Sequence, residues 1–487
     1  MANKLEVISK IPDTRAEVRK KKLVSMGFPV EDVHITDAYT IEADIENLQG
    51  FSSLLANPVV QEVKVNQSVA PEKFDYAIEV GFLPGVTDNV GNTAREIAED
   101  FTSKPIEGQG VYTSQIMFLS GKLSRADAMA IGNSLSNPVI QRASVKSYDE
   151  FMKDNGMGVI VPRVKLHESP TADIVDLLNA PDDSLVIIGK QGIANSDGTR
   201  RGPLALDLSY MKAIQGYFRE RGRNPTDLEV ESIAQTWSEH CKHTIFADQI
   251  DDVKDGLFKT YIRNATNQVR KARGKKDICV SVFTDNAGGI IFDDKHLVVD
   301  KAETHNSPSA LDPFGGSITG IVGVNRDPMG FGMGAKPIVN RYGFCFANPE
   351  DARALYKGAN KTQPMLSSRR IMEGVIEGVN VGGNCSGIPT PQGFVYFDES
   401  YRGKPLVFVG TVGLIPRKKH GKELHLKTAR PGDYVVMVGG RVGKDGIHGA
   451  TFASVEISEE SEAKRTSVQV GDPFTEKLLL EASLEII

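Results

Sequence analysis

The chain has 487 residues, which is too long for a single hydrophobic core and predicts about two to four domains. It is 40% hydrophobic and 25% charged, and its net charge of −6 without a long block of one sign argues against a nucleic-acid-binding protein. No apolar run approaches the roughly 20 residues that span a bilayer, and the N-terminus lacks the apolar core of a secretory signal. Four scattered cysteines without CxxC spacing indicate reduced thiols and a cytoplasmic protein.

An internal repeat marks the first 150 residues. Residues 55–65 and 135–145 are identical at six of eleven positions, and each copy runs through an Asn-Pro turn into a Val-rich strand. A strand and a helix precede each copy, at 4–11 and 13–26 and at 76–82 and 92–101. Two such units predict one α+β domain. We interpret it as a structural or assembly domain, because the glycine and charge clusters of the later chain are missing here.

A linker and two helices follow the repeat. Residues 151–205 mix Pro, Asp, Ser and Gly with one short helical segment and are predicted to be a linker. The next globular unit begins at residue 206 with a helix over 208–222. A second helix is predicted over 226–246, because Thr226 and Glu229 have the spacing of a capping box. Its apolar stripe consists of Leu228, Ile233, Ala234 and Trp237.

The end of this second helix carries a dense polar cluster, Glu239, His240, Cys241, Lys242 and His243. Such a cluster indicates a catalytic site or a metal site. The two histidines are three residues apart, which suits either one shared metal or two separate contacts. A zinc site would need further His or Cys at short spacing, and a thiol nucleophile would need a glycine-flanked turn around Cys241; neither is present.

Strands and glycine-rich loops are predicted to alternate beyond residue 280. The predicted strands are 280–285, 288–293, 296–306, 317–328, 341–347, 395–400 and 405–415. A helix over 366–377 is followed by a predicted loop over 380–387, and a basic connector covers 416–425. A new domain then opens with a strand at 433–440 and ends in a helix at 474–487 that has no stop signal, as expected of a truncated domain.

The strand at 296–306 places Lys301, Glu303 and His305 at i, i+2 and i+4, hence on one face. A cation, a carboxylate and an imidazole together suit nucleotide chemistry, in which Lys binds phosphate, Glu binds Mg²⁺ and His acts on a proton. The alternative is a solvated strand face with a salt bridge. The glycine-rich loop that follows favours the functional interpretation.

That loop is predicted over residues 312–338, where glycines would let backbone N–H groups approach an anion. Within it, Arg326 suits a phosphate and Asp327 a metal ion. The chain has no Walker A motif and no GxGxxG in a Rossmann context, so an ATP site here would have a rarer architecture. The alternative is a set of tight structural turns.

Five motifs in order resemble phosphoribosylformylglycinamidine synthase: WSEHCKH, DKAETHNSP, VNRDP, GGRVGKDGIHGATFAS and SVQVGDPFTEKLLLEA. The resemblance implies an α+β chain with four parts. These are a small-subunit-like repeat domain (1–150), a linker (151–205), an aminoimidazole-ribonucleotide-synthetase-like N-terminal domain (206–425) and a partial C-terminal domain (426–487). It also implies a ligase of purine biosynthesis, which forms formylglycinamidine ribonucleotide from formylglycinamide ribonucleotide, ATP and glutamine-derived ammonia.

Site roles follow from the same resemblance. It assigns catalysis to His240 and His305, ATP contacts to His243 and Lys301, and Mg²⁺ to Glu303 and Asp327. It assigns substrate contacts to Thr304, Asn306, Ser307, Arg326 and Gln469. Separate-subunit relatives have a tyrosine in place of His243, and the usual motif THNHP has its second histidine replaced by Ser307.

Other implications concern partners and completeness. The third metal carboxylate, much of the ATP site and the glutaminase with its Cys-His-Glu triad are absent, so we expect an incomplete fragment that depends on a glutaminase partner for ammonia. Two synthetase halves pair in this fold, and an unpaired half is expected to form a homodimer. Two alternatives remain open: a related ATP-dependent kinase or ligase, and a non-catalytic nucleotide-binding scaffold, which the departure at Ser307 favours.

Overall fold

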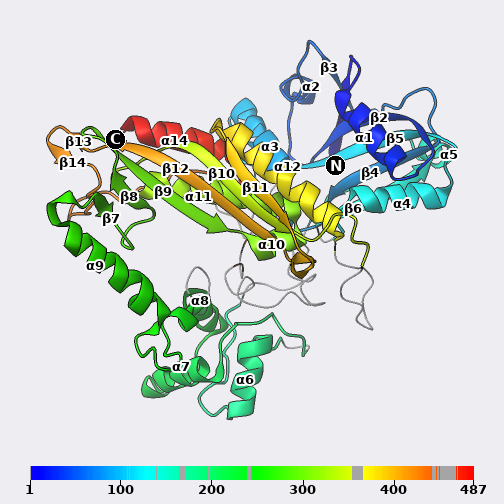
Figure 1. Ribbon diagram of the computed structural model, residues 1–487. Helices are drawn as coiled ribbons and strands as arrows, with labels where there is room; N and C mark the ends of the chain where they lie inside the picture. Colours follow the sequence, from blue (N-terminus) through cyan, green and yellow to red (C-terminus); the bar gives the residue numbers. More distant parts are fainter. Residues whose placement is uncertain are drawn as a thin grey trace. The chain divides into compact units, whose positions relative to one another are not determined.

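The computed structural model describes residues 2–106, 108, 110–138, 140–163, 171–195, 198–238, 243–353, 366–440, 446, 449, 468 and 470–486. These residues form two compact units, Met1–His167 and Glu168–Ile487 (Figure 1). Across the described ranges, no helix combines the length and apolarity that a membrane crossing requires.

The first unit contains one six-stranded antiparallel sheet, in the order β3-β1-β2-β5-β4-β6. Its strands are β1 (Asn3–Ser9), β2 (Val30–Ile41), β3 (Gln61–Val65), β4 (Tyr76–Phe82), β5 (Val111–Gly121) and β6 (Gln141–Ser147). The sheet consists of two halves, β3-β1-β2 and β5-β4-β6, which meet where β2 pairs with β5. Each half contains one copy of the sequence repeat.

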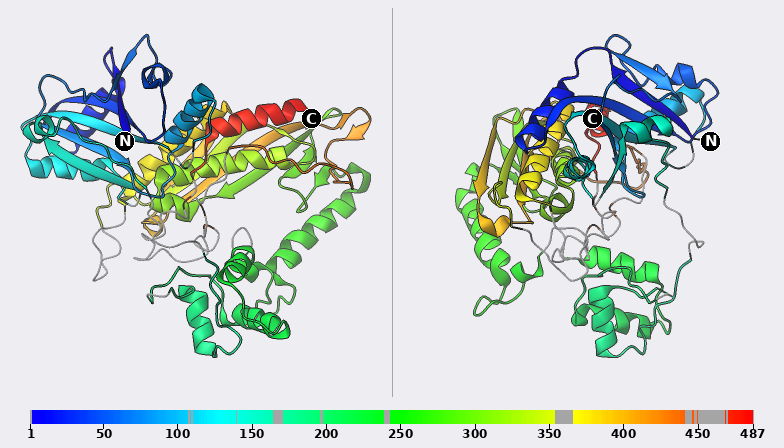
Figure 2. Two further views of the ribbon diagram at one scale, coloured as in Figure 1. Left: turned by 180° about the vertical axis from the view of Figure 1, so that it is seen from behind. Right: turned by 90° about the vertical axis from the view of Figure 1, so that its right-hand side faces the viewer.

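Four helices cover one face of this sheet: α1 (Thr14–Ser25), α2 (Leu48–Ser52), α3 (Asn89–Thr102) and α4 (Arg125–Leu135) (Figures 1 and 2). Leu23 of α1 and Ile131 of α4 pack against Ile78, and Ala98 of α3 packs against Leu5. Burying these side chains removes apolar surface from water and stabilises the helical layer on the sheet.

The chain after β6 covers the opposite face of the sheet. Helix α5 (Tyr148–Lys153) places Phe151 against Phe74, with ring centroids 5.3 Å apart. Lys4 Nζ, from β1, donates to the Gly158 carbonyl at 2.9 Å. Residues 151–158 of the predicted linker therefore pack on the first unit.

A small helical core opens the second unit. It is built from α6 (Asp182–Gln191), α7 (Leu208–Glu220) and α8 (Asp227–Trp237). Its fully buried members are Leu177, Leu185, Leu204, Leu206, Met211, Ile214, Phe218, Val230 and Ala234. One core therefore includes residues from both sides of the predicted boundary at 205/206.

The capping box predicted at the start of α8 is confirmed. Glu229 N donates to Thr226 Oγ1 at 3.2 Å, and Thr226 N donates to the Glu229 carboxylate at 2.9 Å. The predicted apolar stripe was partly wrong, because Leu228 is 71% exposed and Val230 is buried in its place. The helix ends at Trp237, where Ser238 turns to extended backbone, so its predicted extent to residue 246 was too long.

Short helical segments lead from α8 to the second sheet. They are η1 (Thr244–Phe246), η2 (Phe258–Arg263), α9 (Asn264–Arg273) and η3 (Gly274–Lys276).

The second unit also contains a six-stranded sheet, in the order β11-β10-β12-β9-β8-β7. Its strands are β7 (Cys279–Ser281), β8 (Gly288–Ile291), β9 (His296–Thr304), β10 (Lys336–Phe346), β11 (Gln392–Phe397) and β12 (Leu406–Pro416). The pair β10–β11 is parallel and the others are antiparallel. The strand predicted over 280–285 was too long, because pairing in β7 stops at Ser281.

One face of this sheet is covered by α10 (Asn306–Leu311), α11 (Pro313–Gly330) and α12 (Ser368–Ser386) (Figures 1 and 2). The strand predicted over 317–328 and the glycine-rich loop predicted over 312–338 were wrong, because Pro313–Gly330 form one helix. The loop predicted over 380–387 was also wrong, because α12 continues to Ser386. Packing overrides the low helix propensity of glycine at both places.

Glycines allow α11 and α12 to lie unusually close together. On α12, Gly374, Gly378 and Gly382 are four residues apart and therefore share one face. A Cβ on Gly378 would lie 2.5 Å from the Phe314 carbonyl oxygen, and one on Gly382 would lie 2.3 Å from an Ile321 methyl carbon. The glycine pattern that resembled loops is therefore a helix-packing pattern.

The C-terminal part contributes the hairpin β13 (Lys418–Lys419) and β14 (Lys422–Glu423), and the helix α14 (Pro473–Ile486). The strand predicted over 433–440 was wrong: residues 433–438 have no strand assignment, and Tyr434 and Val435 are fully exposed. Apolar residues alone do not make a strand without a neighbour to accept its hydrogen bonds. The predicted C-terminal helix is confirmed, and α14 packs on both α11 and α12.

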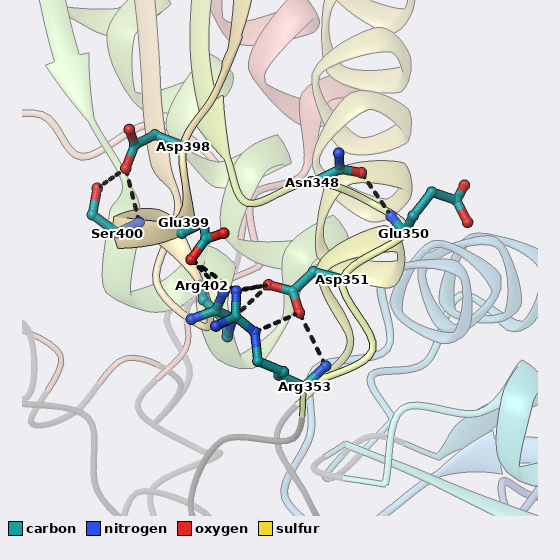
Figure 3. A network of polar contacts seen from close by, with 8 residues as sticks. All are labelled: Asn348, Glu350, Asp351, Arg353, Asp398, Glu399, Ser400 and Arg402. Atoms are coloured by element: carbon teal, nitrogen blue, oxygen red, sulfur yellow. Dashed lines mark hydrogen bonds and ion pairs between the residues drawn. The ribbon is translucent and has the colours of Figure 1, made fainter.

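An ionic network joins the segment after β10 to the segment after β11, which includes η4 (Glu399–Tyr401) (Figure 3). Arg402 Nε donates to Asp351 Oδ2 at 2.6 Å, and Arg353 Nη2 lies 2.8 Å from Glu399 Oε2. The Arg353 backbone N–H and the guanidinium groups of Arg402 and Arg353 lower the pKa of Asp351 to about 2.

We predict that Gly378→Ala lowers the free energy of unfolding by about 1–3 kcal/mol, because the new methyl group overpacks the contact with α11. Urea denaturation measures the change. Gly323→Ala is the matched control, since its Cβ would meet nothing within 4 Å, and it should stabilise α11 by about 0.5–1 kcal/mol. Equal effects of the two substitutions would contradict the close packing.

We predict that Asp351→Asn destabilises the protein at pH 6 and has little effect near pH 2. The folded pKa of about 2 is below the unfolded value, so the stabilisation is complete above about pH 4 and disappears as the pH falls through the folded pKa. Urea denaturation of both proteins at several pH values measures the difference. A difference that stays constant down to pH 2 would contradict the assignment.

Candidate active site

Lys301, Glu303 and Asp327 form a compact ionic cluster. Lys301 and Glu303 come from β9, on the face that buries Leu297 and Val299 beneath α11. Lys301 Nζ lies 3.2 Å from Glu303 Oε1 and 3.4 Å from Asp327 Oδ2, near the end of α11. Strand alternation thus places both β9 side chains toward the helix, as predicted, and α11 adds the third member.

The electrostatics of the cluster favour a charged lysine. Burial alone would lower the pKa of Lys301, but the carboxylates of Asp327 and Glu303 outweigh it and raise that pKa above its ordinary value. Each of these three side chains is between 19% and 32% exposed, so solvent and ligands can reach them. An accessible ammonium between two carboxylates can bind a phosphate whose charge is shared with a metal ion.

The donor set of this cluster fits Mg²⁺. Glu303 and Asp327 supply oxygen ligands that converge on one point, occupied here by the Lys301 ammonium. Protein Mg²⁺ sites use one or two carboxylates, with phosphate oxygens and water completing the octahedron. No group of three or more His, Cys, Asp or Glu with metal-binding geometry occurs among the described residues. The cluster therefore suits Mg²⁺ that arrives with a nucleotide phosphate.

His305 lies between β9 and α10 with a fixed ring orientation. Its Nδ1 hydrogen-bonds the carbonyl oxygen of Gly316, so the neutral ring has its proton on Nδ1 and its lone pair on Nε2. A Cβ on Gly320 would lie 3.1 Å from His305 Cβ, so the glycine leaves room for this side chain against α11. A held imidazole with its lone pair on Nε2 has the form that a proton acceptor requires.

The neighbours of His305 have mixed environments. Thr304 is exposed at the end of β9, whereas Ser307 is only 4% exposed, inside α10. Asn306 Oδ1 accepts from the Val407 backbone N–H at 2.8 Å, which fixes the start of β12. The side-chain oxygen of Asn306 therefore has a structural contact at a position predicted to bind substrate.

Arg326 is exposed next to a buried carboxylate that the sequence analysis did not identify. The Arg326 side chain is 58% exposed, and its Nε lies 3.8 Å from Glu476 Oε1 on α14. Burial raises the pKa of Glu476 to about 8, although Arg326 acts in the opposite direction. No local signal marks Glu476, because its burial depends on α14 packing against α11.

The remaining predicted site residues lie elsewhere or outside the described residues. His243 precedes η1, is exposed, and has its ring centroid 6.2 Å from that of Phe246. His240 and Gln469 lie outside the described residues. The structure therefore brings together Lys301, Glu303 and Asp327, and the glycine-rich segment supplies a helix rather than the predicted backbone cradle for an anion.

The architecture of the second unit agrees with three family models matched by the sequence. Residues 284–415 match the AIR synthase related protein N-terminal domain, and residues 430–487 match its C-terminal domain. Residues 197–243 match the formylglycinamide ribonucleotide amidotransferase linker domain. These three matches agree with the resemblance drawn from the motifs.

Individual proteins with similar sequences are named as subunits of one enzyme. The chain is 36% identical over 292 residues to phosphoribosylformylglycinamidine synthase subunit PurL of Thermoplasma volcanium, covering 59% of this chain and 34% of that one. It is 40% identical over 288 residues to the subunit PurL of Moorella thermoacetica, covering 59% and 33%. The chain thus spans about a third of the length of these curated relatives.

Solved structures of PurL from Thermotoga maritima are also similar. The complex with FGAR is 31% identical, with a TM-score of 0.41 over 57% of this chain and 37% of that chain. The complex with ATP is 29% identical, with a TM-score of 0.38 over 57% and 35%.

We predict that Glu303→Gln and Asp327→Asn each weaken Mn²⁺ binding, used as a paramagnetic substitute for Mg²⁺, by about tenfold or more in the presence of ATP. Electron paramagnetic resonance measures free Mn²⁺. Asp300→Asn is the control, because Asp300 pairs with Arg341 and lies on the other face of β9. Loss of binding in the control but not in the two site variants would refute the assignment.

Proposed function

We propose that this chain supplies the synthetase half-site of a phosphoribosylformylglycinamidine synthase. The reaction converts formylglycinamide ribonucleotide to the amidine in purine biosynthesis, with ATP and glutamine-derived ammonia. The observation that carries the proposal is the Lys301–Glu303–Asp327 cluster, which lies inside the matched AIR synthase related domain. The motifs and the relatives named PurL support the same reaction.

The chemistry requires activation of an amide oxygen. The oxygen attacks the γ-phosphorus of ATP, the bond to ADP breaks, and ammonia then displaces phosphate at the amide carbon. Lys301 neutralises charge on the transferred phosphoryl group. Bound Mg²⁺, held by Glu303 and Asp327, would neutralise further phosphate charge. His305, with its lone pair on Nε2, accepts a proton as nitrogen is added, and His240 is the second catalytic histidine.

Substrate and nucleotide contacts complete the proposed site. Arg326 is exposed and cationic, which suits an anionic group of formylglycinamide ribonucleotide. Thr304, Asn306, Ser307 and Gln469 are the other proposed substrate contacts. His243 is the proposed second ATP contact.

The other parts of the chain have proposed roles in assembly. We propose that residues 1–150 correspond to the small subunit of the enzyme, fused here as two halves of one sheet. We further propose a linker over residues 151–205, a synthetase-like N-terminal domain over 206–425 and part of the C-terminal domain over 426–487. The family model of the linker domain matches residues 197–243, which overlap the start of the proposed N-terminal domain, and the model of the C-terminal domain matches residues 430–487. A glutaminase domain or subunit supplies the ammonia, and the complex works in the cytoplasm.

Exposed apolar side chains among the described residues, on the face of the second sheet opposite α11 and α12, support pairing of two synthetase halves. Ile290, Phe394 and Tyr396 are 40%, 57% and 56% exposed on the face opposite α11 and α12. Apolar side chains in such number on one sheet face are typical of an interface. A second half from the same protein, or a second copy of this chain in a homodimer, would cover them.

A non-catalytic nucleotide-binding scaffold is the second candidate function. Ser307 replaces the usual second histidine of the THNHP motif and is buried in α10, only 4% exposed. The scaffold binds ATP at the Lys301 cluster without turning it over.

We predict ammonia-dependent ADP release with formylglycinamide ribonucleotide from the protein encoded by the full reading frame. His240→Ala should lower kcat by about 100-fold or more, because it removes a proton-transfer group. A coupled ADP assay measures the rate, and Asp300→Asn is the control. ATP binding without substrate-dependent ADP release would favour the scaffold, and an undiminished rate in His240→Ala would overturn the catalytic assignment.

A further inference from the structure

Among the described residues, Glu476 is a buried carboxylate without a hydrogen bond. Its side chain is 3% exposed, and neither of its carboxylate oxygens has a hydrogen-bond partner. Burial of an acceptor in this state is costly, and native structures usually satisfy such groups. A group that is kept in such a position calls for a functional explanation.

Only one cation approaches this carboxylate among the described residues. Arg326 Nε lies 3.8 Å from Glu476 Oε1, which is an ion-pair distance but too long for a hydrogen bond. The rest of the guanidinium is open, because the Arg326 side chain is 58% exposed. This arginine therefore faces a buried carboxylate on one side and is open to solvent on the other.

The segment that carries Glu476 is held firmly against α11. Gly471 N donates to Thr319 Oγ1 at 2.7 Å, and a Cβ on Gly471 would lie 3.1 Å from Val322 Cβ. Val470 packs on the apolar core beneath α11. These contacts hold the backbone just before α14 against α11, and so keep Glu476 close to Arg326.

We propose that Glu476 competes with an anionic ligand for Arg326, so that binding of a phosphate-bearing ligand at Arg326 is coupled to uptake of one proton by Glu476. The ionised carboxylate neutralises the guanidinium and repels an anion. The protonated acid neither neutralises the guanidinium nor repels an anion. The inference rests on the proposed role of Arg326 in binding the substrate's anionic group.

The surroundings of Glu476 support a single, simple titration. Helix α14 packs on α11 and α12. Burial raises the pKa of Glu476 to about 8 and the only charged side chain that opposes this is Arg326 of α11, among the described residues. The other charged groups are Arg369, Arg370, Glu373 and Glu377 on α12, and Lys477, Glu481 and Glu485 on α14.

Sulfate is a suitable probe, because it keeps its double negative charge from pH 6 to pH 9.5. Isothermal titration calorimetry of this chain, in two buffers of different ionisation enthalpy, gives both the affinity and the number of protons taken up. We expect sulfate to bind about tenfold more tightly at pH 7 than at pH 9, since one unit of pKa change corresponds to a tenfold change in affinity. We also expect net proton uptake near pH 8.

Three variants test whether Glu476 takes up the proton and whether Arg326 binds the sulfate. Glu476→Gln mimics the protonated acid, so it should bind sulfate at pH 9 as tightly as the unmodified chain does at pH 7, without proton uptake. Glu481→Gln removes a charge from the same helix, where Glu481 pairs with Lys477 at 2.6 Å, and should behave like the unmodified chain. Arg326→Met should lose sulfate binding. Proton uptake that persists in Glu476→Gln, or no sulfate binding by the unmodified chain, would overturn the proposal.

The same titrations separate this inference from the proposed function. If formylglycinamide ribonucleotide displaces sulfate, and neither ligand binds with proton uptake, the proposed function stands and the proposed coupling fails. If sulfate binds with proton uptake but formylglycinamide ribonucleotide does not compete, the coupling stands and the substrate assignment fails. Thermal unfolding of Glu476→Gln shows whether that variant is folded, and the proton uptake of the unmodified chain tests the coupling without any variant.

Discussion

Close packing of α11 is the constraint on which the second unit depends. This helix is buried along most of its length, between the sheet on one side and α12 and α14 on the other. Glycines on α11 and α12 remove the Cβ atoms that would otherwise hold the backbones apart. Glycine has a low helix propensity, but the close contacts stabilise α11 by more than its glycines destabilise it.

That packing determines the geometry of the proposed site. Near its end, α11 brings Asp327 within an ion-pair distance of Lys301, and the preceding Arg326 faces the buried Glu476. At its start, the Gly316 carbonyl fixes the ring of His305. A single rigid helix thus positions a carboxylate, a guanidinium and an imidazole, and a shift of this helix would disturb all three together.

The sequence predicted much of this site and less of the fold around it. Period-two spacing correctly placed Lys301 and Glu303 on one face of a strand, because that spacing is a local property of extended chain. Within the loop predicted over 312–338, residues 313–330 were misjudged, because a high density of glycine is found both in flexible turns and in helices that pack closely. The burial of Glu476 depends on a contact between α14 and α11, which no local pattern encodes. The strand predicted over 433–440 failed for a similar reason: Tyr434 lies in an apolar segment that has no described partner strand.

The two halves of the sheet in the first unit differ at equivalent positions. Glu6 pairs across the sheet with Lys64, and Glu79 pairs with Ser144, which occupies the same place in the second repeat. Both carboxylates are buried, yet Glu6 accepts from the Val69 backbone N–H at 2.8 Å, whereas Glu79 lies 3.3 Å from Lys4 Nζ. In a dimer of identical chains, one substitution changes both copies of a site. Because the two halves lie in one chain, that restriction is absent here, and each of the two carboxylates can have its own partners.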